Sequence, residues 1–111
     1  MISRKERTLD VYENAGAWMR LLKTVGTETM TAISPVLSAK DTDRMLKALD
    51  TISLVCSDAE ENMFRDHPHV SNEYIDVFYG NVSDEPRNKV DAGILKRVRK
   101  NMEKVLYGKR Y

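Results

Sequence analysis

Apolar residues recur at steps of three and four along most of this chain, and this spacing constrains the fold more than any other feature. Such steps place side chains on one face of an α-helix, whereas a strand alternates in steps of two. The spacing runs through three long segments of the 111 residues. We therefore predict a single all-α domain over residues 1–111, an antiparallel bundle of three long helices plus one short helix.

The first long helix is expected to open at a capping box formed by Ser3 and Glu6. Gly26 predicts a bend or break, after which the helix resumes through Ile33. The apolar stripe of this helix is expected to comprise Leu9, Tyr12, Gly16, Met19, Leu22 and Val25.

The second long helix is expected to cover residues 39–66. Ser34-Pro35 interrupts the chain, and Ser38 with Asp41 predicts a helix start. His67-Pro68 predicts the end of this helix. Its apolar stripe includes the single cysteine, Cys56, which we expect in the core.

The last third of the chain is less regular before the third long helix. Residues 74–79 are rich in β-branched and aromatic types that favour a strand, but no second strand is available as a partner. We therefore expect a short helix that Ser71 caps and that ends at Gly80. Ser83 to Pro86 predict the start of the third long helix, and Gly108 predicts its end.

Charge is strongly segregated along the chain, although its net charge is only +1. Residues 41–85 hold eleven Asp and Glu against three Lys and Arg, whereas residues 86–111 hold nine Lys and Arg against two acids. A basic helix can contact a phosphate backbone, an acidic partner or an acidic neighbour in its own chain.

The basic helix supplies the first candidate site. Four of its cations lie at helical steps of three and four on the flank away from the expected apolar stripe, with Arg99 nearby, so they can contact successive nucleic-acid phosphates. The alternative is a solvated face that complements the acidic middle helix. No zinc-finger, RNP or helix-turn-helix pattern narrows the target. The candidate residues are Lys96, Arg97, Arg99, Lys100 and Lys104.

An acidic surface is the alternative site, on a protein-binding inhibitor or adaptor of the nucleic-acid-mimic type. Spaced carboxylates there would engage the basic groove of a partner protein. Some of these acids sit at a helix C-terminus, which disfavours anions, so we expect a compensating cation from the last helix or a metal. The candidate residues are Asp58, Glu60, Glu61, Asp66, Glu73 and Asp76.

Catalytic and metal-binding patterns are weak. His67 and His69 with nearby carboxylates supply ligand types for a metal enzyme, which is a third hypothesis, but the Glu-x-x-His spacing of bundle metal sites is absent. No P-loop or dinucleotide-binding glycine pattern occurs. We therefore expect a non-enzymatic regulatory protein with no cofactor and no catalytic or metal-binding residue.

Composition completes the set of expectations. A single cysteine suits a reducing compartment, and neither a secretory signal nor a transmembrane segment is expected, so we predict a cytoplasmic protein without membrane contact. The partner is expected to be a nucleic acid or a protein. Homo-oligomers are also expected, because oppositely charged helices can pair between copies.

Trp18 is expected to pack over the first two helices. If it is exposed instead, we expect it to be an interface anchor.

Overall fold

The computed structural model describes residues 1–80, 82 and 85–108, and confirms the all-α class. Every element within this part of the chain is helical. The long helices are α1 (Leu9–Ile33), α2 (Ala39–Asp66) and α3 (Lys89–Tyr107), and the 3₁₀ turns are η1 (Arg4–Glu6), η2 (Ser34–Val36) and η3 (Asn72–Tyr74). The short helix predicted to end at Gly80 is reduced to η3 and a series of turns, although Ser71 does cap it.

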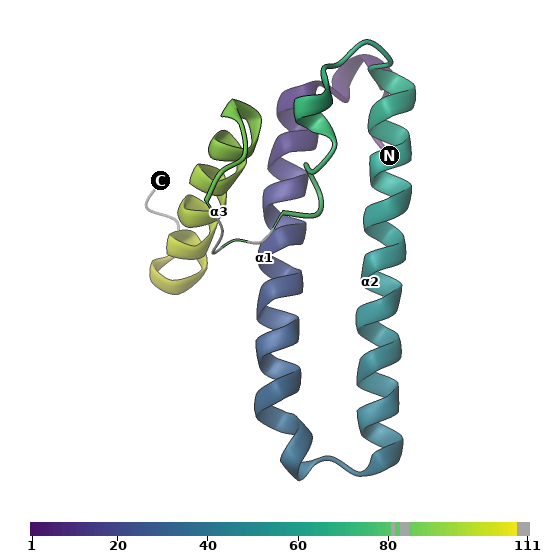
Figure 1. Ribbon diagram of the computed structural model, residues 1–111, viewed down its shortest axis with the longest axis vertical. Coiled ribbons are helices and arrows are strands. Elements are labelled where there is room, and N and C mark those ends of the chain that lie inside the picture. Colours follow the sequence, from purple (N-terminus) through teal and green to yellow (C-terminus); the bar gives the residue numbers. More distant parts are fainter. Residues whose placement is uncertain (81, 83–84, 109–111) are drawn as a thin grey trace.

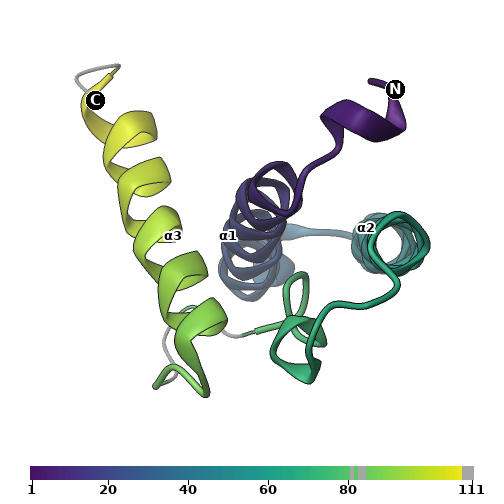
Figure 2. The ribbon, with the colours of Figure 1, turned by 90° about the horizontal axis from the view of Figure 1, so that it is seen from above.

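Helices α1 and α2 form an antiparallel hairpin, and α3 crosses α1 on the side away from α2 (Figures 1 and 2). The expected antiparallel bundle of three helices is therefore not formed. The chain instead forms a hairpin with a third helix that crosses it. The reason is that residues 77–78, which follow α2, pack against α1 before the chain reaches α3. Helix α1 is the central element and contacts both of the others.

The start of α1 differs from the predicted capping box. Ser3 donates to the Glu6 carboxylate at 2.8 Å, but this pair closes only η1. The helix itself begins after Thr8, whose hydroxyl accepts a hydrogen bond from the Val11 N–H at 3.3 Å. Arg7 has a non-helical backbone, and its side chain extends to the end of α2.

The bend predicted at Gly26 is also wrong, because α1 is continuous from Leu9 to Ile33. A Cβ atom on Gly26 would lie 2.8 Å from the Leu49 side chain in α2. The glycine therefore lets the two helices approach closely. This packing offsets the conformational cost of glycine within a helix.

The bounds of α2 agree with the prediction, since it covers Ala39–Asp66 and the Ser38 hydroxyl accepts from the Asp41 N–H at 3.1 Å. Helix α3 begins later than predicted, at Lys89, with Asn88 as its cap. Ser83 and Asp84 of the predicted start lie outside the described residues. Gly108 ends α3 with a φ of 86°, as its type predicts.

The core lies where α1, the second half of α2, residues 77–78 and α3 meet. Cys56 is fully buried there, as predicted. The residues after η3 act as a wedge between the hairpin and α3, since Val77 and Phe78 are each 1% exposed. The core cluster comprises Tyr12, Ala17, Cys56, Met63, Val77, Phe78, Ile94 and Val98.

Two glycines in helices give opposite predictions for the same substitution. A Cβ on Gly16 would overlap the Val77 carbonyl, so Gly16→Ala is expected to lower the free energy of unfolding by about 1–3 kcal/mol. Gly93 has nothing within 4 Å of such a Cβ, so Gly93→Ala is expected to raise it by roughly 0.5–1 kcal/mol. Urea unfolding measures both. Equal effects of the two changes would contradict the packing described at Gly16.

Candidate functional site

Four of the five predicted cations of α3 lie on the side of the helix that faces away from the core. The buried face of α3 includes Asp91, Ile94 and Val98, and a period of 3.6 residues places Lys96 and Lys100 on the opposite side. Lys96, Arg99, Lys100 and Lys104 are exposed, whereas Arg97 is half-buried toward α1. The structure thus presents four of the five cations to solvent.

The acidic middle helix does not neutralise this basic face. In Figure 2, α1 lies between α2 and α3, so the acids of α2 are held on the far side of the molecule. Arg97 pairs with Asp10 of α1 at 2.5 Å. Within residues 1–80, 82 and 85–108, the other four cations form no ion pair. The charge segregation of the sequence is therefore preserved in space.

A groove of about 490 Å³ runs beside the basic face, between α1 and α3. Asn101 is 9% exposed, and its Nδ2 has no hydrogen-bond partner among the described residues. Burial raises the pKa of Glu13, at the α1 side, and Arg97 opposes this shift. The groove is lined by Glu13, Asn14, Gly93, Lys96, Arg97, Lys100 and Asn101.

Sequence reasoning missed several members of this site. Lys89 is exposed and lies seven residues before Lys96, which is two helical turns and therefore the same face. This spacing was a usable signal. Asn101 could also have been found, because it is a polar residue at helical spacing from the apolar Ile94 and Val98. No sequence signal points to Asn14 of α1, because only the tertiary contact between α1 and α3 brings it to the groove.

The six acidic candidates do not form one exposed surface. Asp58, Glu61 and Glu73 are exposed. Glu60 is half-buried, and its pKa is raised by burial and then by the neighbouring carboxylates of Asp76 and Glu61. Asp76 pairs with Arg87 at 2.8 Å, and the Asp66 side chain is only 4% exposed. Two of the six are thus engaged within the chain.

Asp66 is bound by residues from the N-terminal segment. Its carboxylate accepts hydrogen bonds from Arg7 Nε at 2.6 Å, from Arg7 Nη2 at 3.1 Å and from the Tyr12 hydroxyl at 2.6 Å. The cation expected at this helix C-terminus therefore comes from Arg7 rather than from the last helix. Next to it, His67 Nε2 lies 2.7 Å from the Arg7 carbonyl oxygen. These contacts join the residues around the start of α1 to the end of α2.

The hydrogen bonds from Arg7 and Tyr12 hold the pKa of Asp66 well below its usual 3.8. A carboxylate with a lowered folded-state pKa stabilises the fold above its unfolded pKa, and this contribution is lost as the pH falls through and below about 4. Stability is therefore expected to decline from pH 5 to pH 3, and less steeply in Asp66→Asn. Thermal unfolding at each pH measures this; identical pH profiles for the two proteins would contradict the role of Asp66.

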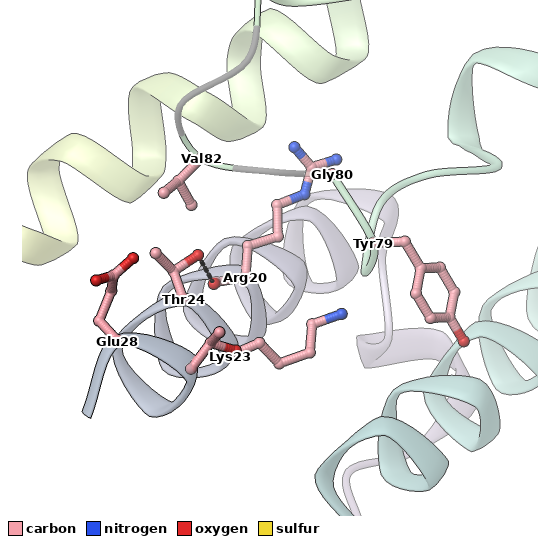
Figure 3. A pocket seen from close by; sticks show the side chains of 8 residues that line it. Arg20, Lys23, Thr24, Glu28, Tyr79, Gly80 and Val82 are labelled. Atoms are coloured by element: carbon pink, nitrogen blue, oxygen red, sulfur yellow. Dashed lines mark hydrogen bonds between the residues drawn. The ribbon is translucent and has the colours of Figure 1, made fainter. Parts of the chain in front are cut away.

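A second ionic cluster fixes the segment before α3. Arg20, 1% exposed, pairs with Asp91 of α3 at 2.7 Å, donates to the Val77 carbonyl at 3.0 Å and also bonds the Asp76 carbonyl. In Figure 3 its guanidinium reaches Gly80, where a Cβ atom would collide with it. Lys23 beside it donates to the Phe78 carbonyl at 2.7 Å. Arg20 and Lys23 line a pocket of about 390 Å³. Both of these cations already bind groups of the chain itself.

Within the described part of the chain, no helix is long and apolar enough to cross a membrane. The same residues contain no group of three or more His, Cys, Asp or Glu placed to hold a metal ion. Comparison with protein-family models, with curated proteins and with solved structures finds no match to this chain.

Proposed function

We propose that this chain is a non-enzymatic interaction module whose α3 contacts nucleic-acid phosphates. One observation carries the proposal: Lys96, Arg99, Lys100 and Lys104 are exposed and form no ion pair within the described residues. Unneutralised cations at helical spacing release counterions when they meet a phosphate backbone, which is the main source of sequence-independent affinity.

The geometry supports phosphate contact rather than base recognition. The exposed cations lie on one side of a single helix whose one aromatic side chain, the exposed Tyr107, stands at its last residue. The adjoining groove is lined by Asn14 and Asn101 rather than by aromatic side chains. Stacking platforms for single strands need aromatic faces beside the cations. We therefore infer that duplex backbone is bound without strong preference for sequence, by a protein of the cytoplasm whose only thiol is buried.

The alternative function, capture of a basic protein through the acidic surface, has weaker support. Asp66 is already paired with Arg7, and Asp76 with Arg87. A partner could bind these carboxylates only by breaking the existing ion pairs, which costs free energy. Asp58, Glu61 and Glu73 remain exposed but come from separate parts of the chain.

Fluorescence anisotropy of labelled duplex DNA, single-stranded DNA and RNA tests the proposal at low salt. We expect the full chain to bind duplex DNA and to be displaced as salt is added. Absence of binding to all three at low salt would overturn the proposal. Binding that is insensitive to salt would overturn the phosphate-contact mechanism.

A further inference from the structure

The half of the α1–α2 hairpin far from α3 has no core of its own. From Leu21 to Val55 no residue is buried, although both helices continue through this region as a pair. Two helices alone bury only one narrow seam, and a stable helical bundle normally encloses its apolar residues with further helices. The exposed apolar side chains of this half therefore need a covering element.

A second apolar stripe, distinct from the one that faces the core, begins near the start of α1 and continues into this half of the hairpin. Its members are separated by steps of four, three, four and three, the 3.5-residue average of a coiled-coil seam. Gly16 and Arg20 face the segment 77–80, and Trp18, two residues from each, lies about 200° around the helix. The stripe comprises Val11, Ala15, Trp18, Leu22 and Val25.

Four of the five stripe residues are exposed, and none of the five is charged. Val11, Leu22 and Val25 are 40%, 47% and 52% exposed. Trp18 is half-buried and belongs neither to the core cluster nor to the residues packed against it. Tryptophan is among the residues that contribute most at interfaces, so its position within an apolar stripe indicates a contact surface.

Helix α2 adds an apolar side chain to the same face. The Ser57 hydroxyl lies 2.9 Å from that of Tyr79, so Ser57 faces the 77–80 segment. Val55, two residues earlier and 52% exposed, therefore points to the opposite side, as the α1 stripe does. The apolar face of the hairpin thus consists of the α1 stripe with Val55 of α2 on the same side.

The chain exposes more surface than a typical monomer of its mass. A monomer of this mass typically exposes about 6,300 Å², whereas this elongated molecule of 47 × 31 × 27 Å exposes 7692 Å². The excess, about 1,400 Å², is more than the roughly 800 Å² that each partner buries in a standard interface. A net charge of +1 gives two copies little reason to repel each other.

We propose that this face binds a second copy of the chain, so that two hairpins pack into a four-helix arrangement around a two-fold axis. A heptad-spaced face on a hairpin is complementary to an identical face, because the same knobs and holes occur on both. The inference rests on the hairpin alone and does not depend on the proposed function.

Sedimentation equilibrium of the full chain over a wide concentration range tests this inference. We expect a mass of twice 12.8 kDa at high concentration. Leu22→Lys/Val25→Lys places two charges in the interface at positions that are half-exposed in one copy, so dimer affinity is expected to fall at least about 100-fold. Leu54→Lys is the matched control, because Leu54 is 66% exposed and precedes Val55 on a different side of α2.

Three outcomes would overturn the inference: a monomer at every concentration, an undiminished dimer in the double variant, or loss of the dimer in Leu54→Lys. Ala15→Glu, at an exposed position of the same stripe, gives a second disruption if the double variant does not fold. Trp18 is the only tryptophan, so its emission is expected to shift to the red on dilution. An emission maximum independent of concentration would also contradict burial of Trp18 between copies.

Discussion

Arg20→Ala is expected to lower the free energy of unfolding by about 3–5 kcal/mol, because it leaves the carboxylate of Asp91 buried without its partner. The side chains of Arg20 and Asp91 are 1% and 6% exposed, so water screens this pair little. The variant also loses hydrogen bonds to the carbonyls of Asp76 and Val77, which hold the wedge segment against α1. Urea unfolding followed by circular dichroism measures the change.

A double-mutant cycle separates the ion pair from the other losses. Arg20→Ala and Asp91→Ala are each expected to be destabilising, and the double variant is expected to lose much less than their sum. The control is Arg44→Ala, which breaks an exposed pair with Asp41 at 3.3 Å and is expected to cost under about 1 kcal/mol. Additive effects of Arg20 and Asp91 would contradict a coupled buried pair.

Replacing Lys96, Arg99, Lys100 and Lys104 together by Gln is expected to weaken binding to duplex DNA on the order of 10²–10³-fold near 100 mM salt. Each change removes one cation that can release counterions from phosphate. Gln has a helix propensity close to those of Lys and Arg, so α3 is expected to keep its structure. Anisotropy titrations measure the affinity, and circular dichroism checks the helix content.

The chain offers a matched control for the net charge. A second variant carries Gln at four exposed cations of α2, which lie across the molecule from α3; they are Lys40, Arg44, Lys47 and Arg65. Both variants lower the net charge by four. We expect the α2 variant to bind nearly as well as the unmodified chain. Equal loss in both variants would show that net charge rather than the α3 face determines binding.

Features that depend on local sequence could be predicted. The bounds of α2 follow from the cap at Ser38 and from the apolar spacing up to His67-Pro68, all of which act within a few residues. The burial of Cys56 follows from the same spacing. The exposed cations of α3 follow from helical periodicity as well, because the apolar stripe fixes which side faces inward.

Features that depend on distant partners could not be predicted. Arg20 resembles a surface cation in the sequence, since its partner Asp91 lies 71 residues away in another helix. Gly26 favours a break by local propensity, but the approach of Leu49 reverses the outcome. The apolar spacing predicts Leu22 and Val25 on one stripe with Tyr12, whereas they lie half-exposed on a second stripe. A helix with apolar residues on two sides does not reveal which side the rest of the chain will cover.

The salt dependence of duplex DNA binding tests the central claim most directly. Four exposed cations in contact with phosphates predict a slope of log affinity against log salt concentration between about −3 and −4. The variant with Gln at the four α3 positions is expected to bring this slope to about −1 or above, because only Lys89 of this face then remains. A slope near zero for the unmodified chain, or an unchanged slope in the variant, would contradict phosphate contact by α3.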